Sequence, residues 1–170
     1  MTTVTTRTPE QTMELGRRIG QWVRAGDVLV LTGDLGAGKT TFTRGLGEGL
    51  GVEGAVTSPT FVLSRVHPSA TGGPGLVHVD AYRLESRGEV DDIDLETDLA
   101  RAVLVAEWGA GLVEQLTDRW IELELRRSST VDEAPDESGP REIQLAAVGE
   151  WEADRERLGA LRELLRGELP

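Results

Sequence analysis

An unbroken phosphate-loop motif constrains this chain more than any other feature of its sequence. Residues Gly33 to Thr40 read GDLGAGKT and satisfy the pattern G-x-x-x-x-G-K-[S/T] in full. The motif follows DVLVLT, an apolar run typical of a buried strand. It precedes KTTFTRGLGEGL, which predicts a helix although glycine is an unfavourable helix former. Strand, loop and helix in this order predict an α/β fold that binds a nucleotide at the loop.

Each residue type in the loop suits phosphate binding. Glycines let backbone N–H groups turn toward phosphate oxygens, and the N-terminus of the following helix adds partial positive charge. Lys39 is expected to reach the β- and γ-phosphates, and the hydroxyl of Thr40 to bind Mg²⁺. Lys39 is the only lysine among 18 lysine and arginine residues, and a planar guanidinium would not replace it here. The predicted nucleotide-binding residues of the loop are Gly33, Asp34, Leu35, Gly36, Ala37, Gly38, Lys39, Thr40 and Thr41.

Residue types that are absent or rare narrow the function further. The chain has no asparagine, so it lacks the Asn-Lys-x-Asp type of motif that binds guanine in GTPases, and adenine is the expected base. A single lysine also excludes ATPases with a second, signature lysine in the loop. A net charge of −12 argues against direct binding of nucleic acid, which needs clustered basic residues. Without cysteine, a leader-like segment or a long apolar run, a soluble cytoplasmic protein with no membrane or DNA partner is expected.

Two carboxylates follow predicted strands and extend the candidate site. The segment AVLVAEW places Glu107 after the apolar residues 103–106, and LVHVDAY places Asp80 at the end of another strand. Strand-end carboxylates hold Mg²⁺ in phosphate-loop enzymes, so we predict Glu107 as a metal ligand, directly or through water. Asp80 is predicted to orient the metal's water shell or the attacking water. The alternative for each is a structural role, as the cap of a strand end or the partner of an arginine.

The segment TSPTF, residues 57–61, lies between the loop helix and the next strand. A segment that senses the nucleotide occupies this place in many phosphate-loop proteins, and Thr60 is then expected to contact the γ-phosphate or Mg²⁺. The alternative is a plain Ser-Pro turn that enters the strand.

The remaining pattern predicts one α/β domain over residues 1–170, with a mixed sheet sandwiched by helices. A capping box at Thr8 and Gln11, with Pro9 in the first turn, predicts a helix that ends at Gly26. Further expected elements are strands at 60–66 and 76–82, a hairpin of 119–125 with 141–148, and an appended amphipathic helix at about 151–168.

In this order and spacing, GDLGAGKTTFTRGLGEGLG, VTSPTFVL, HVDAYRL and VLVAEWG resemble the TsaE (YjeE) family of small bacterial ATPases. The resemblance covers roughly residues 5 to 127. It implies ATP and Mg²⁺ as ligands and a role in making threonylcarbamoyladenosine beside the anticodon of tRNA. It also implies two partners, TsaD, which transfers the threonylcarbamoyl group, and TsaB, its non-catalytic relative. The partners would hold the tRNA, and ATP hydrolysis would reset the complex between turnovers.

The resemblance assigns roles to single residues as well. It implies Asp80, Lys39 and Glu107 as catalytic, Thr40 and Glu107 as metal-binding, and Thr60 as the switch threonine. It places Trp108 beside the nucleotide, where its ring could stack on or shield the ligand. The alternative for Trp108 is core filling, the commoner use of tryptophan.

Two other functions remain open at this point. A small-molecule kinase would suit the size and the loop, although no arginine cluster suitable for a lid is evident. A non-hydrolysing scaffold would use ATP only to order TSPTF for a partner. If the chain is an ATPase, it is expected to be a poor one alone, because no arginine finger is obvious; Arg44 and Arg83 are the candidates. Two loops, 67–75 and 128–140, look like insertions.

Overall fold

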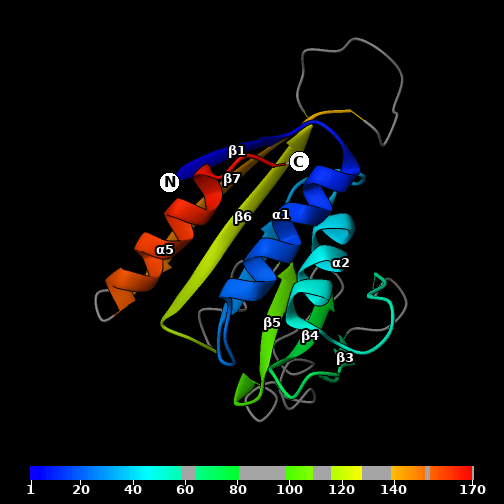
Figure 1. Ribbon diagram of the computed structural model, residues 1–170, viewed down its shortest axis with the longest axis vertical. Coiled ribbons are helices and arrows are strands. Elements are labelled where there is room, and N and C mark those ends of the chain that lie inside the picture. Colours follow the sequence, from blue (N-terminus) through cyan, green and yellow to red (C-terminus); the bar gives the residue numbers. More distant parts are fainter. Residues whose placement is uncertain (59–63, 81–98, 109–115, 128–138, 152–153, 170) are drawn as a thin grey trace.

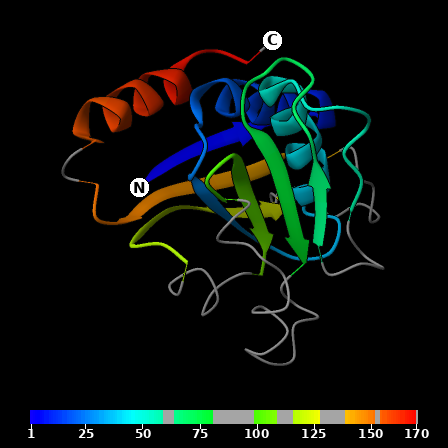
Figure 2. The ribbon, with the colours of Figure 1, turned by 90° about the horizontal axis from the view of Figure 1, so that it is seen from below.

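The computed structural model describes residues 1–58, 64–80, 99–108, 116–127, 139–151 and 154–169. In this part of the chain three helices pack on one face of a seven-stranded mixed sheet (Figures 1 and 2). The predicted α/β fold is thereby confirmed. The elements are β1 (Thr2–Thr6), α1 (Pro9–Trp22), β2 (Val28–Thr32), α2 (Lys39–Leu50), β3 (Ser64–His67), β4 (Gly75–Asp80), β5 (Ala102–Glu107), β6 (Arg119–Arg127), β7 (Arg141–Gly149) and α5 (Arg155–Arg166).

The strands of the sheet run in the order β1-β7-β6-β2-β5-β4-β3. Its centre is parallel, because β2 pairs parallel with both β5 and β6, and β4 pairs parallel with β5. Antiparallel pairs complete both sides, β3 with β4 on one and β6, β7 and β1 on the other. The carboxyl ends of β2, β4 and β5 therefore meet at one edge of the sheet, which is where a ligand site forms in sheets of this kind.

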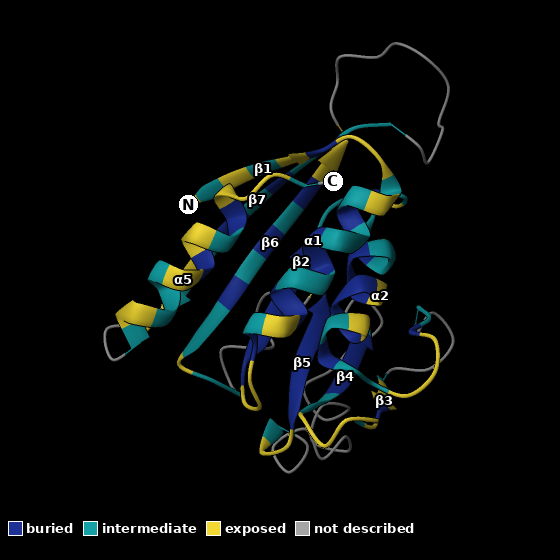
Figure 3. Ribbon diagram, in the orientation of Figure 1, coloured by how far each residue is buried: buried dark blue, intermediate teal, exposed yellow. Residues whose placement is uncertain are grey.

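The apolar runs of the sequence become the buried centre of the sheet. β5 is buried along its whole length (Figure 3), and β2 is buried except at Thr32. One face of the sheet packs against the helices in the main core. The other face carries a smaller apolar cluster formed by Val28, Val30, Val77, Val79, Ala102, Leu104 and Ala106.

Helices α1 and α2 pack unusually close together through glycines. A Cβ added at Gly16 or Gly20 of α1 would lie 2.1 or 2.4 Å from a carbonyl oxygen of α2. A Cβ at Gly45 or Gly49 of α2 would lie 1.8 or 2.1 Å from a carbonyl oxygen of α1. The glycines that count against a helix in the sequence therefore let α1 hold the phosphate-loop helix in place.

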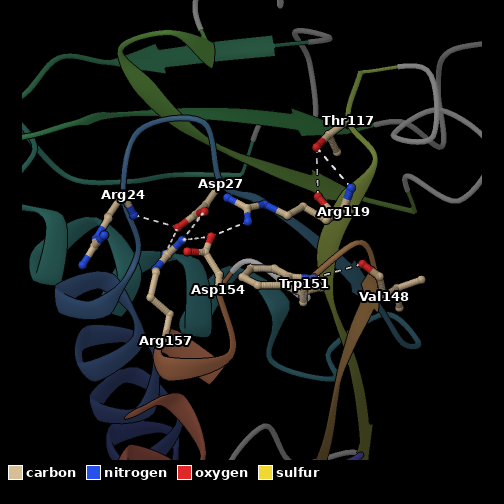
Figure 4. Close-up of polar contacts among 8 residues, drawn as sticks. All are labelled: Arg24, Asp27, Thr117, Arg119, Val148, Trp151, Asp154 and Arg157. Carbon is tan, nitrogen blue, oxygen red and sulfur yellow. Dashed lines mark hydrogen bonds and ion pairs between the residues drawn. The ribbon is translucent and has the colours of Figure 1, made fainter. Parts of the chain in front are cut away.

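Helix α5 is anchored at the end of the sheet remote from the loop (Figure 4). The Arg157 guanidinium forms two bonds of 2.5 and 3.2 Å with Asp27, and Arg119 pairs with Asp154. Arg157 also lies over the rings of Trp22 and Trp151, 4.6 and 5.8 Å from their centroids. The expected apolar stripe of this helix packs on the main core, with Leu161 and Leu165 buried and Leu158 and Leu164 partly buried.

Most predicted element types are confirmed, with two differences near the N-terminus. Thr8 caps α1 and accepts the Gln11 N–H at 3.3 Å, while the Gln11 Oε1 accepts the Arg7 N–H at 2.8 Å; the helix ends at Trp22 rather than Gly26. Val23 is extended, and the next residues turn because the Asp27 carboxylate accepts the Arg24 N–H. Strand β1 was not predicted; its single apolar residue is Val4, and it forms by pairing with β7.

The strand expected at 60–66 is seen as β3 from Ser64, since residues 59–63 lie outside the described part. No helix in the described ranges is long and apolar enough to cross a membrane.

Candidate nucleotide-binding site

The phosphate loop connects β2 to α2 and has the backbone that the motif requires. Gly33 and Gly38 have φ angles of 134° and 104°, in the region that favours glycine. A side chain at Gly33 would also meet the Leu125 carbonyl oxygen at 2.1 Å. Gly38 is the N-cap of α2 and makes no side-chain capping bond, so the positive end of the helix faces the loop without a side chain in the way.

Lys39 is held at the mouth of this loop. Its ammonium donates to the carbonyl oxygens of Gly33 and Asp34, at 2.7 and 3.1 Å. The Nζ atom also lies 5.0 Å from the centroid of the Trp108 ring. The backbone N–H of Trp108 donates to the Leu31 carbonyl at 2.9 Å, and the residue is 41% exposed. That exposure excludes core filling as the use of this tryptophan.

The two predicted carboxylates come together at the end of the sheet. Asp80 of β4 and Glu107 of β5 are register partners, and Glu107 is also opposite Leu31 of β2, shortly before the loop. Glu107 is 8% exposed, and its Oε1 lies 3.0 Å from Nε2 of the fully buried His78. The sequence pattern predicted no role for His78, although this residue lies two positions before Asp80.

A cavity of about 1090 Å³ lies over the loop and the strand ends. Ten of the predicted site residues line it, namely Asp34, Leu35, Gly36, Gly38, Lys39, Thr40, Thr41, Asp80, Glu107 and Trp108. Gly33 and Ala37 do not line it; Gly33 binds Lys39 through its carbonyl, and the Ala37 side chain is buried beneath the loop. Thr60 and Arg83 fall outside the described residues.

The cavity has a wall that the sequence analysis missed. Pro9, Thr12, Gly139 and Arg141 line it without having been predicted, whereas Ser58, which also lines it, belongs to the predicted TSPTF segment. Thr12 comes from α1 and Arg141 from the start of β7, so only the tertiary fold brings them to the loop. An isolated arginine beside a polar loop gave no usable signal in the sequence.

Two arginines bring positive charge to the cavity. Arg44, a predicted arginine-finger candidate, lines it, and its Nε donates to the Val56 carbonyl at 3.3 Å. Arg141 is only 5% exposed, and its Nη2 donates to the Gly36 carbonyl at 3.3 Å. A phosphate at the loop would therefore meet the charges of Lys39 and these two guanidinium groups.

The oxygen atoms of the site suit Mg²⁺ bound together with a nucleotide. Within the described ranges no three His, Cys, Asp or Glu residues cluster tightly enough to hold a metal by themselves. Mg²⁺ does not need such a cage, because it commonly keeps several waters and takes one or two carboxylates together with phosphate oxygens. Thr40, Asp80 and Glu107 line one cavity and offer oxygen ligands of this kind.

A family model described as "Threonylcarbamoyl adenosine biosynthesis protein TsaE" matches residues 6–134. The chain belongs to the TsaE family. The tRNA threonylcarbamoyladenosine biosynthesis protein TsaE of Streptomyces coelicolor is 55% identical over 140 residues, which cover 81% of this chain and 90% of that protein. The TsaE protein of Bacillus subtilis is 38% identical over 141 residues, covering 83% of this chain and 82% of the relative.

The fold agrees with this membership of the TsaE family. The crystal structure of Bacillus subtilis YdiB matches with a TM-score of 0.70 and 29% sequence identity. The match covers 97% of this chain and 94% of YdiB.

Proposed function

We propose that this chain is a Mg²⁺-dependent ATPase of threonylcarbamoyladenosine biosynthesis, which hydrolyses ATP in a cytoplasmic complex with TsaD and TsaB. The observation that carries the proposal is the convergence of Lys39, Thr40, Asp80 and Glu107 on one cavity at the end of the parallel strands. Membership of the TsaE family and the names of its relatives support the pathway.

Binding of ATP would use the loop and its lysine. The N-terminus of α2 faces the phosphates, and the Lys39 ammonium exchanges the Gly33 and Asp34 carbonyls for phosphate oxygens. This exchange keeps the lysine hydrogen-bonded in both states, so little is lost when it turns to the ligand. Trp108 shields the same charge from water and lies where it would cover the bound nucleotide.

Hydrolysis asks mainly for positioning and for neutralisation of charge. Thr40 and Glu107 would hold Mg²⁺, which when bound neutralises phosphate oxygens. Asp80 lies beside Glu107 and would orient the attacking water, or accept its proton if the two are within hydrogen-bond reach. The acidic charge of the chain fits a protein that leaves the binding of tRNA to its partners.

The test is ATP turnover by the purified chain, alone and with the TsaB–TsaD pair from the same organism. Turnover should be low alone, rise with the pair, and vanish in Lys39→Ala. Threonylcarbamoyladenosine formed by the same mixtures shows whether hydrolysis serves the pathway. Turnover that ignores the pair would remove the partner-dependent role, and a phosphorylated small-molecule product would establish a kinase instead. Full product formation with an Asp80→Ala chain that binds ATP but does not hydrolyse it would establish the scaffold.

A further inference from the structure

The buried histidine His78 contacts a residue of the proposed metal site. It lies on β4, is 0% exposed, and its Nε2 is 3.0 Å from Oε1 of Glu107 on β5. His78 and Asp80 are two residues apart on one strand, so their side chains leave the same face of the sheet. The imidazole therefore lies beside the carboxylates of the site, and it does not line the cavity.

The contact determines which nitrogen of His78 carries the proton. An ionised carboxylate only accepts hydrogen bonds, so Nε2 must be the N–H donor to Glu107. Nδ1 is buried and has no partner among the described residues, which suits a lone pair better than a second N–H that would be left unsatisfied. A tautomer that carries its proton on Nε2 and none on Nδ1 satisfies both conditions.

The hydrogen bond from His78 restricts the Glu107 side chain, which could otherwise adopt several rotamers. Glu107 lines the cavity through a longer side chain than the aspartate usual at such sites, so its carboxylate has more positions available. With Oε1 held by His78, one orientation is selected and Oε2 is left for the metal side. Carboxylates that bind a metal are generally held by hydrogen bonds from outer partners, and loss of such a partner typically lowers metal affinity by about 10- to 100-fold.

We propose that His78 is a positioning residue that orients Glu107 toward nucleotide-bound Mg²⁺. This inference rests on the proposed function, because it concerns the metal of the same site. It assigns His78 no contact with ATP, so nucleotide affinity without metal should not depend on it.

The experiment measures the affinity for ADP by calorimetry, once with Mg²⁺ and once with EDTA. The affinity with Mg²⁺ divided by the affinity with EDTA is the metal dependence. His78→Gln keeps an N–H donor at the reach of Nε2, whereas the shorter His78→Asn does not. We expect His78→Asn to lose about tenfold or more of the metal dependence, and His78→Gln to retain most of it. Affinity in EDTA should be unchanged in both. The matched control is His67→Asn, which replaces the chain's other histidine, also buried but on the neighbouring β3.

The outcomes separate this inference from the proposed function. Metal dependence lost in Glu107→Gln but intact in His78→Asn would overturn the role of His78 alone. Equal loss in EDTA and Mg²⁺, or the same loss in His67→Asn, would show a merely structural histidine. ADP binding that ignores Mg²⁺ in the wild-type chain would contradict the proposed function and the inference together. If His78→Asn does not fold, the ¹⁵N spectrum of the wild-type imidazole decides, since a proton on Nδ1 instead of Nε2 refutes the arrangement.

Discussion

Replacing Gly45 by alanine places a methyl group inside the contact between α1 and α2. The new Cβ would lie 1.8 Å from the Met13 carbonyl oxygen and 2.7 Å from its carbon. Because real Cβ contacts essentially never fall below 3.0 Å, the helices must separate there by roughly 1.2 Å. Both contacting groups are backbone, so a change of rotamer cannot relieve the overlap.

Two effects of opposite sign decide the result. Alanine is the better helix former by about 1 kcal/mol, which would favour the variant if space were available. Overpacking a close contact costs about 1–3 kcal/mol, and an overlap between backbones belongs at the upper end of that range. We therefore expect Gly45→Ala to lower the free energy of unfolding by about 2 kcal/mol, and the melting temperature by roughly 4–8 °C for a chain of this size.

The assay is thermal and urea unfolding followed by circular dichroism without nucleotide. The matched control is Gly159→Ala in the middle of α5, where an added Cβ has no atom within 4 Å. That change should raise the free energy of unfolding by about 0.5–1 kcal/mol, because only the helix preference acts. If Gly45→Ala were as stabilising as Gly159→Ala, the close approach of α1 and α2 would be wrong.

Three further predictions concern other parts of the molecule. Arg141→Met should weaken binding of ADP several-fold, or about 1 kcal/mol, since it removes a buried guanidinium from the cavity, whereas Arg126→Met on the same hairpin, outside the cavity, should not; equal affinities would exclude a role for Arg141. Asp27→Asn should lower the free energy of unfolding by about 3 kcal/mol, because the buried Arg157 loses its partner at 2.5 Å and keeps only Asp154 at 3.6 Å. Asp154→Asn removes a more exposed carboxylate and should cost about 1 kcal/mol or less, and similar losses would refute this ranking. Burial, with a smaller effect of the Arg65 charge, lowers the pKa of His67 from 6.5, so below pH 6.5 the unfolded chain binds a proton that the folded chain does not. The free energy of unfolding should therefore decrease as the pH is lowered from 6.5 to the folded-state pKa. In His67→Gln this loss of stability at low pH should be smaller, as measured by urea unfolding midpoints above and below pH 6.5. An unchanged dependence of the midpoint on pH would contradict the role of His67.

Local signals in the sequence were sufficient for the central elements. The apolar runs at 28–32 and 102–107 are buried strands, and the hairpin of 119–127 with 141–149 pairs as expected. The burial of the two apolar strands is predictable from their own residues, because a strand covered on both faces must be apolar throughout. The loop motif likewise carries its geometry in its glycines.

Features that depend on distant partners were not predictable in the same way. Strand β1 has only Val4 as an apolar residue and owes its existence to the free edge of β7. The glycines of α2 look unfavourable until α1 is packed against them. Arg141 and His78 reach the site through the order of strands in the sheet, which no short motif records.

The most direct test of the account is ATP turnover by wild-type and Asp80→Ala chains, each with the TsaB–TsaD pair and at an ATP concentration that calorimetry shows to be saturating. We expect both chains to bind ATP and only the wild-type chain to turn it over. Equal turnover by the two chains would contradict the assignment of hydrolysis to the carboxylates at the ends of β4 and β5.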